Sequence, residues 1–210
     1  WSSDVCSSDL ILFEPNNPNE AAEHISYNEL YQRVNKMANV LRQQGIEKGD
    51  RVCIYLPMIP ELAIALLACA RIGAVHSVVF AGFSAQALSS RIEDSSCKLV
   101  ITADGGYRGT KTIDLKAIVD EALLSCPSVE RVLLVKRTNA AIDVVEGRDL
   151  WIADHLERAD VVCEPEVMEA EDPLFILYTS GSTGKPKGMV HTTAGYMIGA
   201  AYTFKNVFQY

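Results

Sequence analysis

Residues 174–188 read LFILYTSGSTGKPKG, an apolar run that passes directly into a loop rich in glycine, hydroxyl groups and lysine. The run at 174–178 is short, apolar and partly aromatic, which predicts a buried strand. The loop at 179–188 holds three glycines, four hydroxyl side chains and two lysines, and no acidic residue. Glycines let backbone N–H groups approach a ligand closely, and hydroxyl and ammonium groups donate hydrogen bonds to anions. The stretch therefore predicts a strand that ends in a polyphosphate-binding loop.

The charge distribution supports an anion-binding role for this loop. The chain has 19 basic and 27 acidic residues and a net charge of −8. From Pro173 to Tyr210 there is no Asp or Glu but there are three lysines, so the other 172 residues carry −11. Each charge-assisted hydrogen bond to phosphate contributes roughly 1.5–3 kcal/mol, and several together can hold a nucleotide. The alternative is a flexible Gly/Ser linker, which seldom follows a buried strand or contains Lys-Pro-Lys.

The loop does not match the P-loop of ordinary NTPases. That motif is G-x-x-x-x-G-K-[ST], and its last hydroxyl binds magnesium. Here Lys185 follows Gly184, but the next residue is Pro186, which has no hydroxyl. The position five residues before Gly184 is Thr179, which is not a glycine. The P-loop interpretation therefore fails at two positions.

The loop resembles the phosphate-binding signature [ST]-S-G-[ST]-T-G-x-P-K-G of adenylate-forming acyl-CoA synthetases. Three segments resemble the AMP-forming acetyl-CoA synthetases within that superfamily: YTSGSTGKPKGMVHTTAGY at 178–196, IPELAIALLACARIGAVHSVVFAGFS at 59–84, and ITADGGYRGTK at 101–111. The resemblance runs from about Ile11 to Tyr210. It implies an acetate–CoA ligase that converts acetate and ATP to acetyl-AMP and then transfers the acetyl group to CoA. Propionyl-CoA or another short-chain acyl-CoA synthetase is an alternative, and so is a non-catalytic nucleotide- or CoA-binding module.

The resemblance also implies roles for individual residues of the loop. Lys187 is expected to supply charge or to pin the loop, and is the candidate catalytic residue of this chain. Lys185 is either a ligand contact or a solvated loop lysine, and Pro186 stiffens the loop. The implied ATP phosphate-binding residues are Thr179, Ser180, Gly181, Ser182, Thr183, Gly184, Lys185, Lys187 and Gly188.

A second implied site concerns CoA. In the family a basic segment after a strand binds the phosphorylated end of CoA, and the matching residues here are Arg108, Gly109, Thr110 and Lys111. Many relatives have arginine where Lys111 stands, and lysine cannot bind a phosphate in the bidentate manner of arginine. Gly82 matches the position where the family lets the pantetheine arm pass. Without the resemblance, two basic residues on a glycine-rich loop are more typical of an ordinary solvated surface.

The rest of the chain predicts an α/β fold with a mostly parallel sheet layered between helices. Strands are expected at about 51–56, 75–80, 98–103 and 131–135, and helices at about 61–71, 84–94 and 113–124. Ser26 and Glu29 form a capping box for another helix, with Leu30, Val34, Ala38 and Leu41 at helical spacing. Residues 136–172 are expected to be a surface excursion. Both candidate loops follow strands directly, and ligands of such sheets lie beyond the carboxyl ends of strands.

The domain interpretation follows from the resemblance. Residues 1–10 (WSSDVCSSDL) have no counterpart in the family and are expected to be a non-native or unmatched leader. Residues 11–210 are expected to be part of the large N-terminal AMP-binding domain of adenylate-forming enzymes. The small C-terminal domain and the carboxylate that binds Mg²⁺ are expected beyond Tyr210, so the chain should be inactive alone and should hold no metal site.

Composition indicates which other partners to expect. The four histidines are spread out, and the six cysteines include no C-x-x-C pair, so neither zinc nor a redox dithiol is indicated. Cys53 and Cys69 lie in apolar runs and are expected in the core. The apolar stretch at 52–83 is interrupted by prolines and charges, so no membrane span is predicted. Free thiols and an acidic charge favour a cytoplasmic protein that binds small molecules and no nucleic acid.

Overall fold

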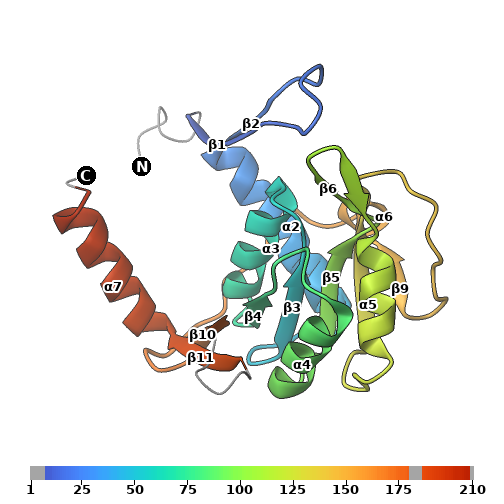
Figure 1. The fold of residues 1–210 in the computed structure, drawn as a ribbon. Coiled ribbons are helices and arrows are strands. Elements are labelled where there is room, and N and C mark those ends of the chain that lie inside the picture. Colours follow the sequence, from blue (N-terminus) through green and yellow to red (C-terminus); the bar gives the residue numbers. More distant parts are fainter. Residues whose placement is uncertain (1–7, 180–185, 209–210) are drawn as a thin grey trace.

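The computed structural model describes residues 8–179 and 186–208. These residues form an α/β fold in which helices cover a seven-stranded sheet (Figure 1). The strand order across the sheet is β11-β10-β4-β3-β5-β8-β9. The strands are β3 (Arg51–Tyr55), β4 (Val75–Val78), β5 (Leu99–Ala103), β8 (Arg131–Val135), β9 (Asp149–Trp151), β10 (Pro173–Thr179) and β11 (Lys187–Thr192).

The sheet is parallel except at its β10–β11 edge, where the two strands form an antiparallel hairpin. The predicted α/β class with a mostly parallel sheet is therefore confirmed. The prediction that 174–178 forms a buried strand is wrong in its burial: the strand β10 is present, but none of its residues is buried among the described residues. β5 reads LVITA and is buried throughout, as expected for a strand covered on both faces. Because parallel strands end at one edge, the carboxyl ends of β3, β4, β5 and β10 lie along the same edge of the sheet.

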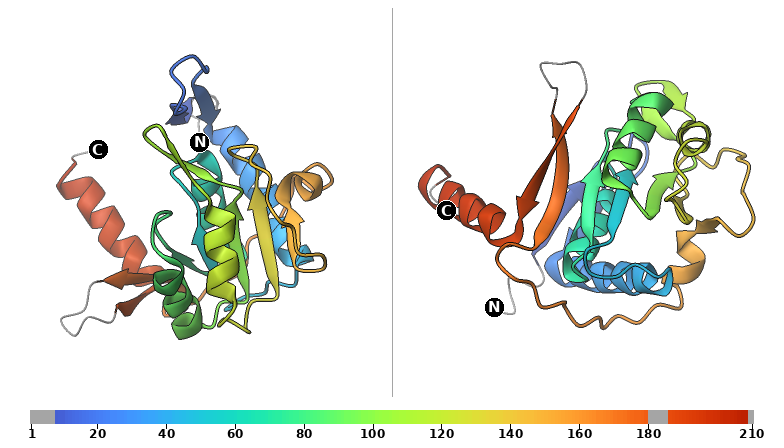
Figure 2. Two further views of the ribbon diagram at one scale, coloured as in Figure 1. Left: turned by 45° about the vertical axis from the view of Figure 1, so that its right-hand side comes forward. Right: turned by 90° about the horizontal axis from the view of Figure 1, so that it is seen from below.

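Two pairs of helices cover the two faces of the sheet. Helices α2 (Tyr27–Gln43) and α3 (Pro60–Arg71) lie on one face, and α4 (Ala85–Ser95) and α5 (Leu115–Leu123) on the other (Figure 2). The Ser26 hydroxyl accepts a hydrogen bond from the Glu29 N–H, which confirms the predicted N-cap of α2. The Glu29 carboxylate pairs with Arg33. The predicted apolar stripe of α2 is buried: Leu30, Val34, Ala38 and Leu41.

The prediction of a surface excursion at 136–172 is wrong for part of that segment. It contains β9, which pairs in parallel with β8, and the short helix α6 (Ile152–Leu156). A three-residue strand is too short to show a periodic pattern, so the sequence contains no clear signal for it. Its place in the sheet depends on contacts with β8 and α5, which are remote in sequence.

Two small hairpins complete the described fold. β1 (Asp9–Phe13) pairs with β2 (Glu23–Ser26), and β6 (Gly106–Arg108) pairs with β7 (Lys111–Ile113). The helix predicted from 113 begins at Leu115 because 111–113 is a strand, and the Asp114 carboxylate caps it by accepting from the Ala117 N–H. The first two residues of β1, Asp9 and Leu10, belong to the leader that the sequence sets apart.

The last helix, α7 (Thr193–Asn206), follows β11 and projects from the edge of the sheet (Figures 1 and 2). None of its residues is buried among the described residues, and large apolar side chains such as Met197, Ile198 and Tyr202 are exposed. In the described part of the chain, no helix combines the length and the apolarity that crossing a membrane requires.

A cluster of four charged side chains ties β9 to helix α5. The Lys116 Nζ lies 2.6 Å from the Asp120 Oδ2 and 2.9 Å from the Asp149 Oδ2, and it donates to the Asp143 carbonyl. Arg148 pairs with both carboxylates. The side chains of Lys116 and Asp149 are 1% and 0% exposed. Buried charges are tolerated only when they are paired, so this cluster holds residues 143–149 in place.

We expect the stability of the chain to fall in acid through Asp149. Burial raises the pKa of Asp149, but hydrogen bonds from Arg148, the Val145 N–H and Lys116 outweigh this and lower it below its usual range. A lowered folded-state pKa gives stability that is present above the unfolded value of about 3.9 and is lost as pH falls through the folded value. Urea unfolding between pH 3 and 7 measures the loss.

Asp149→Asn should remove the pH-dependent stability that the Asp149 carboxylate contributes. The variant should be destabilised by about 3 kcal/mol at pH 7 and should show a shallower decline below pH 4. Asp154→Asn, at an exposed carboxylate of α6, is the matched control and should keep the wild-type profile. A wild-type pH profile in Asp149→Asn would contradict the role of Asp149.

Candidate functional site

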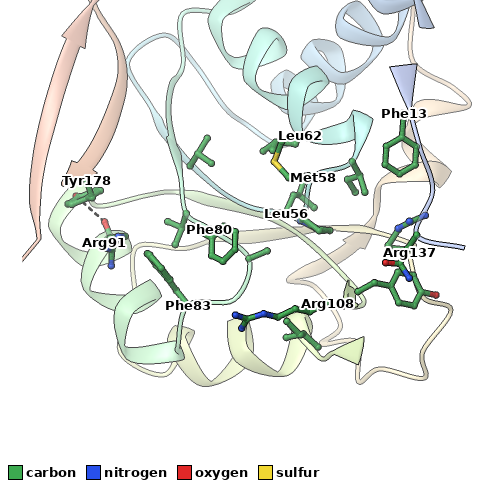
Figure 3. Close-up of a pocket in the computed structure, with 18 of the residues that line it drawn as sticks. Phe13, Leu56, Met58, Leu62, Phe80, Phe83, Arg91, Arg108, Arg137 and Tyr178 are labelled. Carbon is green, nitrogen blue, oxygen red and sulfur yellow. Dashed lines mark hydrogen bonds between the residues drawn. The ribbon is translucent and has the colours of Figure 1, made fainter. Parts of the chain in front are cut away.

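A cavity of about 850 Å³ lies at the carboxyl edge of the sheet, where β3, β4 and β10 end (Figure 3). Its walls are largely apolar, and segments far apart in the sequence contribute to them. The apolar part includes Phe13, Leu56, Met58, Leu62, Phe80 and Phe83. The charged part consists of Arg91, Arg108, Arg137 and Glu14. Apolar walls with a few charged groups are typical of sites that bind a large organic anion.

The β10–β11 hairpin places the candidate phosphate loop at this edge. Thr179 is the last residue of β10 and pairs with Lys187, the first residue of β11, and both are exposed. Pro186 and Tyr178 line the cavity. Gly188 pairs with Tyr178, and a Cβ at Gly188 would lie 3.2 Å from the Tyr178 ring. The remaining loop residues of the sequence prediction lie outside the described residues: Ser180, Gly181, Ser182, Thr183, Gly184 and Lys185.

The β6–β7 hairpin carries the four basic and small residues that match the CoA segment. Arg108 and Lys111 pair across the hairpin, and Gly109 and Thr110 form its two-residue turn. Gly109 has φ +61°, a conformation that glycine adopts without strain. All four residues are exposed, and Arg108 lines the cavity. Within the described residues the Arg108 guanidinium has no hydrogen bond or ion pair, which leaves its donors available to an anion.

Gly82 lies in the loop after β4, between the cavity-lining residues Ala81 and Phe83. The Gly82 N–H donates to the Tyr55 hydroxyl at 3.3 Å, and that hydroxyl donates to the Phe83 carbonyl at 2.7 Å. Gly82 has φ +151°, and a Cβ there would lie 3.0 Å from the Phe80 ring. The position therefore favours glycine both for its backbone conformation and for the space next to Phe80.

Arg137 holds the β6–β7 hairpin against the N-terminal strand β1. Its guanidinium lies over the rings of Phe13 and Tyr107, 5.4 and 5.3 Å from their centroids. Cation–π contacts of this kind contribute roughly 0.5–2 kcal/mol each. Nearby, the Asn16 side-chain amide donates to the Gly109 carbonyl at 3.3 Å. These contacts fix the hairpin that carries Arg108 at the mouth of the cavity.

Helix α4 contacts Tyr178, the residue before the candidate phosphate loop. The Tyr178 hydroxyl donates to the Asp94 Oδ2 at 2.6 Å. The Arg91 guanidinium lies over the rings of Phe83 and Tyr178, 5.0 and 5.4 Å from their centroids. Figure 3 shows Arg91 and Tyr178 together at one end of the cavity and Arg137 at the other.

Sequence reasoning did not identify Phe13, Arg91, Asp94, Arg137 or Tyr178 as parts of the site. They come from different elements, and their proximity arises from the packing of those elements on the sheet. One weak signal was available for two of them, since Arg91 and Asp94 are three residues apart and must lie on one side of the predicted helix. For Phe13 and Arg137 the sequence contains no such signal.

The histidines near the site have structural roles. The His191 ring stacks on Phe175 near the start of β10, with centroids 4.4 Å apart. Phe175 also stacks on His76 at 5.3 Å, and burial lowers the pKa of His76 to about 4, so its imidazole is neutral. Among the described residues, no cluster of three or more His, Cys, Asp or Glu side chains could hold a metal ion. Cys53 and Cys69 are buried in the core as expected.

Residues of the basic hairpin and residues next to the candidate phosphate loop line one cavity. Tyr178, which precedes the candidate phosphate loop, and Pro186, which belongs to it, line the cavity, and the basic hairpin contributes Arg108. A ligand with phosphates at one end and an apolar arm could extend along the walls between them. Of the described residues that the sequence assigns to the two sites, Arg108 lines this cavity. Tyr178 and Pro186 next to the candidate phosphate loop, and Phe83 next to Gly82, line it as well. The other described candidates are not among its lining residues: Gly82, Gly109, Thr110, Lys111, Thr179, Lys187 and Gly188.

Comparison with known proteins shows which proteins this chain resembles. The family model described as "AMP-binding enzyme" matches residues 11–210. The chain is 60% identical over 200 residues to acetyl-coenzyme A synthetase 2 of Pseudomonas aeruginosa, covering 95% of this chain and 31% of that protein. It is 57% identical to acetyl-coenzyme A synthetase of Saccharophagus degradans, with 95% and 31% covered. It is 56% identical to acetyl-coenzyme A synthetase of Nostoc linckia, with 95% and 59% covered.

The chain thus spans about a third of the length of most of these relatives. The matched segment includes the β10–β11 hairpin, the β6–β7 hairpin and the whole seven-stranded sheet. Because a family model covers all but the first ten residues, this chain belongs to the AMP-binding enzyme family.

Proposed function

We propose that this chain carries the phosphate-binding loop and part of the CoA site of an AMP-forming acetate–CoA ligase. The observation that supports this most directly is the shared cavity, which is lined by Pro186 and Tyr178 at the loop and by Arg108 at the basic hairpin. Relatives named acetyl-coenzyme A synthetase are 54–60% identical to the chain. The proposed substrates are acetate, ATP and CoA.

The first proposed step is the formation of acetyl-AMP. A carboxylate oxygen of acetate attacks the α-phosphorus of ATP, and the bond to the bridging oxygen of pyrophosphate breaks. Negative charge develops on the departing pyrophosphate, so donors fixed around the β- and γ-phosphates stabilise the transition state. We assign this role to the loop at 179–188, with the hydroxyl of Thr179 and the ammonium group of Lys187 at its two described ends.

The second proposed step transfers the acetyl group to CoA. The CoA thiolate attacks the carbonyl carbon of acetyl-AMP, a thioester forms, and AMP leaves with the electron pair of the broken mixed-anhydride bond. Arg108 and Lys111 are assigned to the CoA phosphates, and the cavity wall near Gly82 to the pantetheine arm. The apolar Phe80 and Phe83 rings suit the uncharged part of that arm.

Mg²⁺ would be expected with ATP in this reaction, as a counter-charge on the phosphates. The described residues offer no carboxylate cluster for it. We therefore assign no residue of this chain to the metal.

The proposal is tested in a protein that has the full length of one of the relatives. We call "extended enzyme" a protein in which residues 11–210 replace the matching 200 residues of the Pseudomonas aeruginosa relative. It should catalyse acetate-dependent exchange between ATP and labelled pyrophosphate, and it should form acetyl-CoA when CoA is added. If ATP–pyrophosphate exchange is faster with propionate than with acetate, the assigned substrate would change to propionate. No exchange with any short-chain acid, from a protein that binds ATP, would contradict the proposal and favour a binding module.

The 210-residue chain itself should bind ligands without turnover. We expect no acetate-dependent exchange above background, because the family implies that catalytic groups lie beyond Tyr210. Exchange by the purified chain would contradict this expectation.

We further propose a cytoplasmic location, since the described residues include five free, buried cysteines, as is typical of proteins in reducing compartments.

Gly82→Val tests the CoA side of the cavity. The new side chain would press on the Phe80 ring and would strain a backbone that has φ +151°. Strain of this kind costs of order 1–3 kcal/mol, so we expect KM for CoA to rise about tenfold in the extended enzyme. Acetate-dependent pyrophosphate exchange should stay within twofold of wild type. A normal KM for CoA would contradict the placement of CoA next to Gly82.

A further inference from the structure

Helix α4 contacts the residue that immediately precedes the proposed phosphate loop. Tyr178 immediately precedes Thr179, and its hydroxyl donates to the Asp94 Oδ2 at 2.6 Å and lies 3.3 Å from the Arg91 carbonyl. Burial and the hydrogen bond to Asp94 raise the pKa of Tyr178, so the phenol remains protonated and remains a donor. The side chain that anchors the loop is therefore held by two groups on one turn of α4.

Arg91 extends this contact to the CoA side of the cavity. Its guanidinium lies 5.4 Å from the Tyr178 ring centroid and 5.0 Å from that of Phe83. One of its N–H groups donates to the Ala87 carbonyl of the same helix, which fixes its orientation. Phe83 belongs to the loop of Gly82, and its carbonyl accepts from the Tyr55 hydroxyl. Arg91 thus packs between the base of one candidate site and the wall of the other.

Arg91 lines two neighbouring cavities. It lines the main cavity of about 850 Å³ and also a smaller one of about 430 Å³. The smaller cavity is lined by Ser90, Glu93, Asp94, Tyr178 and Pro186 as well. Tyr178 therefore contacts α4, and Pro186 of the loop lines the same small cavity as residues of α4.

We infer that Arg91 and Asp94 of helix α4 are positioning residues that hold the phosphate loop through Tyr178 and connect it to the CoA-facing loop at Phe83. Neither residue is assigned a contact with substrate. The kinetic part of this inference rests on the proposed function. Small displacements of groups that stabilise a transition state cost large factors in rate, so an anchor at the base of the loop affects the ATP step. Because a helix is rigid, it can supply such an anchor.

The Tyr178–Asp94 hydrogen bond can be removed from either end. Tyr178→Phe deletes the donor and keeps the ring, and Asp94→Ala deletes the acceptor. In the extended enzyme each should raise KM for ATP in pyrophosphate exchange about fivefold, with KM for CoA within twofold of wild type. The double variant should show the same fivefold effect, because both changes remove one interaction. Glu93→Ala, at the neighbouring exposed carboxylate, is the matched control and should behave as wild type.

Replacing Arg91 should affect both substrates, because its guanidinium contacts Tyr178 before the phosphate loop and Phe83 on the CoA side of the cavity. Arg91→Ala should raise KM for ATP and KM for CoA, each by about fivefold. Arg91→Lys keeps a cation above the rings and should restore both values to within about twofold of wild type. A wild-type KM for ATP in Tyr178→Phe and Asp94→Ala, or effects that multiply in the double variant, would overturn the inference. A parallel loss of both half-reactions with a lowered melting temperature would also overturn it, because that result indicates a general structural role.

A second measurement does not depend on catalysis. In the 210-residue chain, trypsin can cleave after Lys187 at the end of the loop. Release of the anchor should increase this cleavage about threefold in Tyr178→Phe and in Asp94→Ala, and not in Glu93→Ala. Unchanged cleavage would overturn the inference even if the extended enzyme is inactive. An inactive wild-type extended enzyme with increased cleavage in the two variants would contradict the proposed function alone.

Discussion

Gly184→Val in the extended enzyme is expected to lose at least a hundredfold of its acetate-dependent pyrophosphate exchange. Glycine lets the backbone N–H approach a phosphate oxygen, and a β-branched side chain prevents both that approach and the turn. Loss of one fixed donor to a developing charge costs roughly 10²–10³ in rate. Gly184 itself lies outside the described residues, so its role rests on the motif, and Thr179 and Lys187 locate the two ends of the loop.

The second half-reaction is the control for this variant. When acetyl-AMP is supplied directly, Gly184→Val should form acetyl-CoA from CoA at a rate within about threefold of wild type. This is expected because the loop is assigned to the β- and γ-phosphates, which acetyl-AMP lacks. The melting temperature should also stay unchanged. Exchange activity within tenfold of wild type would contradict the assignment of Gly184 to the phosphate loop.

Arg108→Ala is expected to raise KM for CoA in the extended enzyme by about ten- to a hundredfold. Arg108 lines the cavity, and within the described residues its guanidinium has no acidic partner to compete with a ligand phosphate. Hydrogen bonds from a charged donor to phosphate contribute roughly 1.5–3 kcal/mol, which corresponds to this range. Acetate-dependent pyrophosphate exchange should be unchanged, because it takes place before CoA binds.

Two controls separate a phosphate contact from a general effect of charge. Arg131→Ala removes an arginine at the start of β8, at the opposite edge of the sheet, and should leave KM for CoA unchanged. Pantetheine has the thiol and the arm of CoA without its phosphates, so Arg108→Ala should not weaken its use as a substrate. Equal loss of both half-reactions in Arg108→Ala would remove the assignment.

Local sequence patterns predicted most of the sheet because each signal lies within a few residues. β8 was predicted at the observed bounds, and β3 and β5 within one residue. The cap at Ser26 was predicted because its side chain accepts a hydrogen bond from an N–H three residues later. β9 was missed because three residues cannot show a period, and its position depends on Asp149 meeting Lys116 of α5.

The two candidate sites were predicted as residue sets, but not as neighbours. The loop at 179–188 and the segment at 108–111 each contain a motif that can be identified from local sequence. Their approach to one cavity requires the parallel order in which β10 lies beside β4, β4 beside β3, and β3 beside β5. No local pattern encodes that order, because it depends on how strands remote in the chain pair with one another.

The amino-acid sequence by itself therefore determined the fold class, the family signature and the residue types available to bind anions. Glycine, hydroxyl and lysine spacing is enough for this because backbone freedom and charge are local properties of the chain. Only the tertiary structure decided which side chains contact the two segments: Arg91 and Asp94 contact Tyr178, and Arg137 contacts Tyr107 of the β6–β7 hairpin. Those contacts form between elements distant in sequence, so they arise from packing on the sheet and have no local pattern of their own.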